Sequence, residues 1–123
     1  MAGLHVGSFD APDEVRSPDK TTMNIVRMGD RTTAARMTLQ PGWRWSECIK
    51  PIAGTDSCQV HHNGYCVSGR MRIRMDDGAE QEVGPGDVFV VSPGHDAWVV
   101  SDEACVVYDF AGQMATEYAK SKG

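Results

Sequence analysis

The stretch Gly84 to Trp98, GPGDVFVVSPGHDAW, constrains the fold more than any other part of the chain. It opens with a Gly-Pro-Gly-Asp turn, continues through a short valine-rich segment, and closes with a Pro-Gly turn. Glycine adopts positive φ freely and proline fixes φ at a corner, so this order predicts a turn, a short strand and a second turn. Strands this short, separated by tight turns, are typical of small β-barrels and sandwiches.

The rest of the chain repeats this alternation of short strands and turns. Gly29-Asp30 and Asp76-Asp77-Gly78 are typical of tight hairpins. We expect strands over residues 4–9, 22–28, 32–39, 43–45, 57–68, 71–75, 79–83, 88–91, 97–100 and 104–110, a loop over 50–54, and no interior helices. Only residues 113–120 have helical spacing. The pattern predicts one all-β domain, with an N-terminal edge strand and loop (1–20), a barrel (21–112) and a C-terminal tail or short helix (113–123).

Composition argues against several classes of protein. The net charge of −5 does not provide the basic face that nucleic acids or anionic membranes require. No apolar run is long enough to cross a bilayer. The N-terminus lacks the charged and apolar segments of a signal peptide, so we expect a cytoplasmic protein without nucleic-acid or membrane partners. In that reducing compartment the four cysteines are expected to be free thiols.

Two stretches together resemble the paired motifs of the cupin superfamily. They are residues 56–69, DSCQVHHNGYCVSG, and residues 84–98. Gly69 matches the last glycine of the first cupin motif, and Gly86 and Gly94 match glycines of the second. The resemblance covers residues 35–110 and is greatest to small single-domain cupins of the conserved-barrel type (cupin 2 type). It implies a double-stranded β-helix, or jelly-roll barrel, whose interior holds the functional site.

The metal-ligand positions of the cupin motifs are substituted in this sequence. Alignment on the glycines places Asp56, Cys58 and His62 at three of these positions and Ala97 at the fourth. Side chains alternate along a strand, so Asp56, Cys58 and His62 are expected on the face that lines the barrel. His95 lies two residues before Ala97 and is expected to point inward as well, where the small Ala97 leaves space.

Two kinds of chemistry are open to this set. His62, His95, Cys58 and Asp56 are candidate ligands of a divalent metal (Fe, Zn, Mn or Ni), with Cys48 and Glu47 as alternates. Without a metal, His62 and His95 are candidates for a catalytic acid and base. The competing interpretation is a metal-free pocket in which the cysteines are small buried hydrophobic residues.

A second set of residues is a candidate for binding a small organic ligand. Aromatic rings with polar tips are typical of ligand pockets, and core packing is the competing interpretation. Asp96 is placed either to orient the His95 imidazole or to cap the turn before it. The candidates are Trp43, Trp45, Lys50, Tyr65, Asp96 and Trp98, with Trp43 and Trp45 on one face of a strand.

The sequence therefore predicts a small-molecule-binding cupin barrel, leaning to an enzyme of the metal-dependent oxygenase, isomerase or lyase type. The alternatives are a non-catalytic ligand-binding or sensing module and a purely structural protein. The resemblance implies a homodimer, because cupins of this size are often dimers, and the N-terminal strand is a candidate for sheet addition across the two-fold axis.

Overall fold

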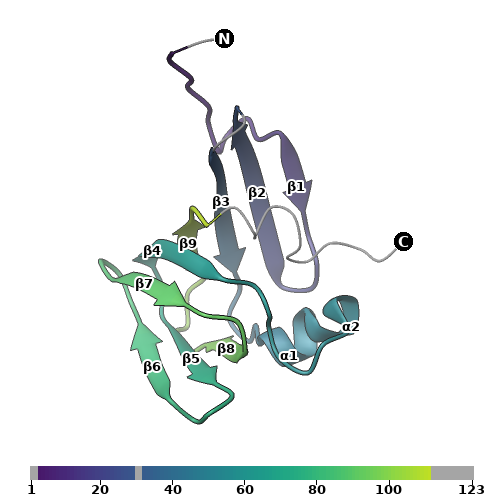
Figure 1. Ribbon diagram of the computed structural model, residues 1–123. Coiled ribbons are helices and arrows are strands. Elements are labelled where there is room, and N and C mark those ends of the chain that lie inside the picture. Colours follow the sequence, from purple (N-terminus) through teal and green to yellow (C-terminus); the bar gives the residue numbers. More distant parts are fainter. Residues whose placement is uncertain (1–2, 30–31, 112–123) are drawn as a thin grey trace.

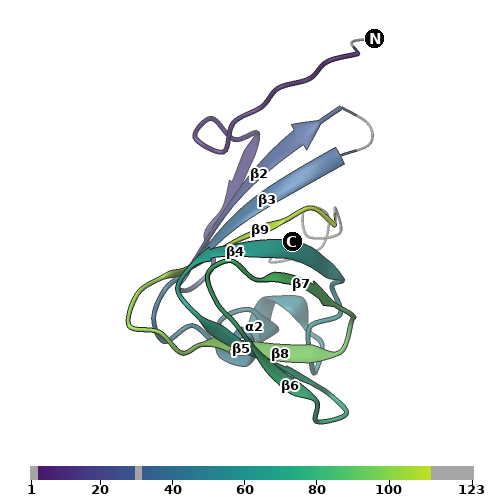
Figure 2. The ribbon, with the colours of Figure 1, turned by 90° about the vertical axis from the view of Figure 1, so that its left-hand side faces the viewer.

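The computed structural model describes residues 3–29 and 32–111, whose strands form two antiparallel sheets (Figures 1 and 2). The larger sheet has the strand order β1-β2-β3-β9-β4-β7, and the smaller has the order β6-β5-β8. The strands are β1 Glu14–Arg16, β2 Thr21–Met28, β3 Thr32–Leu39, β4 His62–Ser68, β5 Met71–Met75, β6 Glu80–Val83, β7 Val88–Val91, β8 His95–Val99 and β9 Cys105–Asp109. The all-β prediction is confirmed.

The two sheets face each other and share one core. In Figure 2, β4 and β7 of the larger sheet lie above β5, β6 and β8 of the smaller one. Side chains alternate between buried and more exposed along β8 and β9, as the period of a strand requires. The inward residues of β9 are Cys105, Val107 and Asp109. One carboxylate thus follows two apolar side chains on the face that points into the barrel.

The segment between β3 and β4 contains two single-turn helices, α1 (Trp45–Cys48) and α2 (Lys50–Ala53). The predicted strand over 43–45, the predicted loop over 50–54 and the prediction of no interior helices are therefore wrong. Arg44 is extended and forms an isolated bridge with Trp98, and the chain turns helical immediately after it. Pro51 lies in the first turn of α2, where its missing N–H costs no hydrogen bond.

Other strand boundaries also differ from the prediction; β8, for example, begins at His95 and not at Ala97. Residues 4–9 form no strand, apart from an isolated bridge between Ser8 and Ala11, and the edge strand is β1. Residues 57–61 precede β4 and contribute one isolated bridge, between Cys58 and His95. The helix expected over 113–120 lies outside the described residues. No helix among residues 3–29 and 32–111 is long and apolar enough to span a membrane.

Because Gly64 has no side chain, β4 can lie very close to its neighbour β9 at this position. A Cβ built at this position would collide with the carbonyl oxygen of Tyr108 on β9 and lie 3.0 Å from the Phe89 ring on β7. At Gly64, β4 pairs regularly with both β7 and β9. The pairing of β4 with β9 shifts register further along, between Cys66 and Ser68.

Candidate functional site

A small cavity lies between the two sheets. Its volume is about 40 Å³, and both sheets and the segment between β3 and β4 contribute to its wall. The residues that line it are Met37, Leu39, Trp43, Trp45, Cys58, His62, Met71, Ile73, Phe89, Val91, His95, Ala97, Val107 and Asp109. Most of these side chains are apolar. The polar groups among them are one thiol, two imidazoles, one carboxylate and two indoles.

Backbone hydrogen bonds place Cys58 beside His95. The Cys58 N–H donates to the carbonyl oxygen of His95 at 2.7 Å, and the Gly94 N–H donates to the carbonyl oxygen of Cys58 at 2.7 Å. Gly94 has a φ of 95°, which favours glycine and brings the chain from the Pro93 turn into β8. Both side chains are buried, Cys58 at 2% and His95 at 3% exposure.

A buried carboxylate fixes His62, the first residue of β4. The Nδ1 atom of His62 lies 2.7 Å from Oδ2 of Asp109, which is 2% exposed. An ionised carboxylate only accepts hydrogen bonds, so Nδ1 of His62 is the donor in this contact. The Nε2 atom lies 3.8 Å from Sγ of Cys58. This is the carboxylate–histidine arrangement that orients imidazole ligands in metalloproteins.

A backbone carbonyl orients His95 in the same way. Its Nδ1 lies 2.8 Å from the carbonyl oxygen of Ser92, so Nδ1 donates and Nε2 is left as an acceptor. The rings of His95 and His62 meet edge to face, with centroids 5.0 Å apart. Burial, aided by the neighbouring His62, lowers the pKa of His95 to about 4. His95 is therefore neutral near pH 7, the form in which histidine binds metals.

Cys58, His62 and His95 fit a metal ion. One ligand atom from each lies within 4.8 Å of the other two. Zinc ligands at about 2.0–2.3 Å in a tetrahedron are roughly 3.3–3.8 Å apart, so small side-chain adjustments complete the geometry. Burial raises the pKa of the Cys58 thiol to about 12, so the thiol is protonated until a cation displaces its proton. Both the donor atoms and their supports thus suit a nitrogen and sulfur metal centre.

The other candidate metal ligands lie elsewhere. Asp56 is exposed, since residues 57–61 are not a continuous strand and the alternation assumed for it does not hold. Glu47 is also exposed, on α1. Cys48 is buried on α1, with its thiol 3.6 Å from Asp19. None of these three lines the cavity, which corrects the inward placement expected for Asp56.

Of the predicted ligand-binding residues, only Trp43 and Trp45 line the cavity. Trp43 and Trp45 line the cavity, although Trp45 does so from a helix. Tyr65 is 42% exposed on β4, and Lys50 is half-buried on α2; neither lines the cavity. Tyr65 follows His62 by an odd number of residues, so it faces outward.

Asp96 and Trp98 lie on the outer face of β8, opposite His95 and Ala97. The Asp96 carboxylate accepts hydrogen bonds from the Ser46 N–H at 3.1 Å and from Arg44 Nη1 at 3.4 Å. The Arg44 guanidinium lies 4.4 Å from the centroid of the Trp98 ring. Asp96 therefore anchors the start of α1 and does not orient His95, and Trp98 packs under Arg44 outside the cavity.

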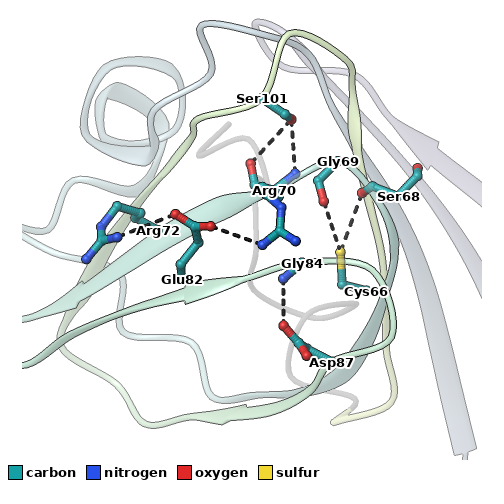
Figure 3. Close-up of polar contacts among 9 residues, drawn as sticks. All are labelled: Cys66, Ser68, Gly69, Arg70, Arg72, Glu82, Gly84, Asp87 and Ser101. Carbon is teal, nitrogen blue, oxygen red and sulfur yellow. Dashed lines mark hydrogen bonds and ion pairs between the residues drawn. The ribbon is translucent and has the colours of Figure 1, made fainter.

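Cys66 has a structural environment of its own (Figure 3). Its thiol contacts the carbonyl oxygens of Ser68 at 3.4 Å and Gly69 at 3.8 Å, beside the register shift in β4. On the neighbouring surface Arg70 and Arg72 both pair with Glu82. All four cysteines are free and buried in the structure.

Two residues of the cavity wall, Asp109 and Phe89, were not predicted as site residues. Asp109 could have been found, because Cys105, Val107 and Asp109 alternate on one face of a predicted strand and a carboxylate there is unusual. Phe89 lies at a boundary: with Ile73 and Val91 it lines both the cavity and an open groove of about 750 Å³ between β6 and β7. These three side chains separate the cavity from the groove.

Comparison with known proteins finds similarity in structure only. No protein-family model and no curated protein matches the sequence. An oxalate decarboxylase of Bacillus subtilis, with Mn(II) centres, matches with a TM-score of 0.63 and 18% identity over 89% of this chain and 30% of that chain. The polyketide cyclase RemF of Streptomyces resistomycificus matches with a TM-score of 0.62 and 15% identity over 98% and 82% of the two chains. An RmlC-like cupin of Shewanella frigidimarina matches with a TM-score of 0.58 and 15% identity over 88% and 90%.

These matches show that the chain has the cupin fold, as its framework glycines predicted. The chain spans only 30% of the oxalate decarboxylase, and at these identities the likeness concerns the fold. The evidence for a reaction in this protein therefore lies in the residues of its own cavity.

Proposed function

We propose that the protein is a metal-dependent cupin that acts on a small molecule inside its barrel, with Cys58, His62 and His95 as the metal ligands. The observation that carries this proposal is the convergence of the three ligand atoms within 4.8 Å, with Asp109 behind His62. With Cys58, His62 and His95 as its protein ligands, a bound ion would still be able to bind a water or a substrate.

The donor set favours Zn²⁺ or Fe²⁺ among the metals expected from the sequence. Thiolate and imidazole are softer ligands than the carboxylate and water that suit Mn²⁺. The Mn(II) of the oxalate decarboxylase is therefore a poor guide to the metal of this chain. A divalent ion with the Cys58 thiolate leaves one positive charge, which the nearby Asp109 carboxylate offsets.

The chain's own residues define the rest of the site. A bound ion would polarise a carbonyl or activate water or O₂, which suits an oxygenase, isomerase or lyase. Asp109 and the Ser92 carbonyl hold the two imidazoles in the tautomer that presents Nε2, and the apolar wall limits water. A metal-free acid and base pair is less well supported, because a His95 with a pKa of about 4 is not protonated near pH 7. The free thiols are also consistent with a reducing, cytosolic setting.

Metal analysis tests the proposal. We expect untreated protein to contain close to one Zn or Fe per chain, and Cys58→Ala to lose it. Cys48→Ala is the matched control, since Cys48 is a buried thiol that does not line the cavity. A wild-type protein that contains no metal and binds no added Zn²⁺ would overturn the proposal in favour of a metal-free ligand-binding barrel.

A further inference from the structure

The barrel is not closed by hydrogen bonds between β6 and β7. Each is the edge strand of its own sheet, and no pairing joins the two within residues 3–29 and 32–111 (Figure 2). The open groove of about 750 Å³ lies along this gap, with residues of both strands in its lining. Side chains, and not backbone contacts, therefore separate the candidate site from the groove here.

Three apolar side chains form this partition, because Ile73, Phe89 and Val91 line both the cavity and the groove. The strand register places two of them next to the candidate site. Val91 pairs with His62, and Phe89 pairs with Gly64. Paired residues of neighbouring strands share one face of the sheet, so Val91 lies on the same face as the His62 imidazole. A molecule in the groove is thus one layer of side chains away from a candidate metal ligand.

Phe89 is the part of this partition that can move most easily. Among the described residues that line the cavity, only His62 and Phe89 are partly exposed, and Asp109 holds His62 in place. Phe89 lies on a short edge strand, and its ring packs over Gly64, which has no side chain. A phenylalanine ring that turns about χ1 into the groove breaks no hydrogen bond. Ile73 and Val91 are both buried and have no such freedom.

We propose that Phe89 is the specificity-determining residue of the candidate site, because its ring closes the gap between β6 and β7 and molecules reach the metal ion only when the ring turns aside. The inference rests on the proposed function in taking the ion as the destination, and it adds the route and the residue that limits substrate size. The cavity, of about 40 Å³, accommodates about three water-sized groups. A larger substrate therefore places only its reacting end beyond Phe89, and the rest of it lies in the groove.

Alkylation of the Cys58 thiol tests this access without a metal. Iodoacetamide is added to the metal-free full chain, and peptide mapping by mass spectrometry gives a reaction rate for each cysteine. Cys48 and Cys105 are buried thiols that do not line the cavity, so their rates report opening of the whole fold. The rate at Cys58 relative to these two measures passage into the cavity.

Substitutions in the cavity wall identify the gate. Phe89→Ala should raise the relative rate at Cys58 about 10- to 100-fold, because burial of a phenylalanine ring favours the closed position by roughly that factor. Phe89→Leu keeps part of the side chain and should give a smaller increase, and it tests the same point if Phe89→Ala fails to fold. Met37→Ala is the control, since Met37 lines the cavity but not the groove and its loss should leave the relative rate unchanged.

Protein loaded with Zn²⁺ gives a second readout. A side chain that only blocks the route changes entry and exit of the ion by the same factor. Phe89→Ala should therefore speed both Zn²⁺ uptake and Zn²⁺ removal by excess chelator, and leave Zn²⁺ affinity unchanged.

The outcomes separate this inference from the proposed function. Equal relative rates at Cys58 in wild type and Phe89→Ala, in protein that binds Zn²⁺ normally, overturn the inference and leave the metal centre standing. An increase in Met37→Ala as large as in Phe89→Ala overturns it too, because general loss of packing would then explain both. A faster rate at Cys58 in Phe89→Ala alone, in protein that binds no Zn²⁺, supports the gate and removes the metal.

Discussion

The contact between His62 and Asp109 determines how the His62 ring is oriented. With Nδ1 held at 2.7 Å from the carboxylate, Nε2 faces the Cys58 thiol. If His62 binds a metal as proposed, the buried carboxylate would also make its imidazole a stronger ligand. Asp109 is thus a positioning residue, which acts through His62.

The Asp109→Asn substitution tests this role. It keeps the size of the side chain but removes its charge, so we expect Zn²⁺ affinity to fall about 10- to 100-fold. Asp96→Asn is the control, because this carboxylate lies on the outer face of β8 against Ser46 and Arg44. Competition with a chelator measures both affinities. Equal losses in the two variants would show that Asp109 has no special relation to the metal.

The lowered pKa of His95 predicts that the stability of the metal-free protein depends on pH. Its pKa is about 4 in the folded chain, against about 6.5 in the unfolded chain. The unfolded state therefore binds more protons between these values, and stability present above pH 6.5 is lost as the pH falls towards 4, by up to about 3 kcal/mol. Urea unfolding of wild type and His95→Gln across this range measures the effect. Parallel pH profiles for the two proteins would contradict it.

Among the elements, β4 has two roles that depend on residues close together in the sequence. It presents His62 to the cavity, and through Gly64 it approaches β9 so closely that no Cβ fits. The position of His62 relative to Asp109 on β9 depends on that approach.

Gly64→Ala should therefore damage both the fold and the site. The new methyl group meets the Tyr108 backbone, which cannot move aside as a flexible side chain would, so we expect a loss of about 2–3 kcal/mol in stability. Zn²⁺ affinity should fall with it. Gly3→Ala, with no atom within 4 Å of its Cβ, should change stability by less than about 0.5 kcal/mol. Thermal unfolding measures the stability of both variants. Equal melting temperatures would contradict the expected collision at Gly64.

Turn chemistry explains why most strands could be predicted and the segment between β3 and β4 could not. Glycines and prolines mark the turns that separate β5, β6, β7 and β8, and alternation then places Ala97 and Val99 on the inner face. In Trp43-Arg44-Trp45 the alternation covers only three residues, and a tertiary contact from Asp96 to the Ser46 N–H stabilises a helical turn there. Propensity over so few residues is easily overridden.

Local sequence spacing also explains which residues of the candidate site could be predicted. The cupin resemblance and its spacing pointed to Cys58, His62 and His95, which the structure brings together. Asp56 was assigned to the same face on the assumption of a strand that begins only at His62. No local pattern could predict that Asp96 binds to α1, because that contact joins segments far apart in the sequence.

At the scale of the whole molecule, the outer face of the larger sheet is unusually apolar near one edge. Val88 is 79% and Val90 70% exposed on the edge strand β7, and Tyr65 and Val67 of β4 are also exposed. An exposed apolar edge strand favours pairing with another chain. We therefore place the expected homodimer contact at β7.

Sedimentation analysis of two variants tests this placement. Val90→Lys should convert a dimer to monomer, whereas Val15→Lys, on the edge strand β1, should leave it intact. The reverse result would favour sheet addition by the N-terminal strand. A wild-type protein that is monomeric at all concentrations would contradict both.

The proposed function depends on a metal ion bound in the barrel by Cys58, His62 and His95. X-ray absorption at the zinc edge, on protein loaded with one equivalent of Zn²⁺, tests this most directly. We predict one sulfur ligand at about 2.3 Å and two imidazole nitrogens at about 2.0–2.1 Å, with the sulfur lost in Cys58→Ala. A zinc environment made only of oxygen and nitrogen, unchanged by Cys58→Ala, would contradict it.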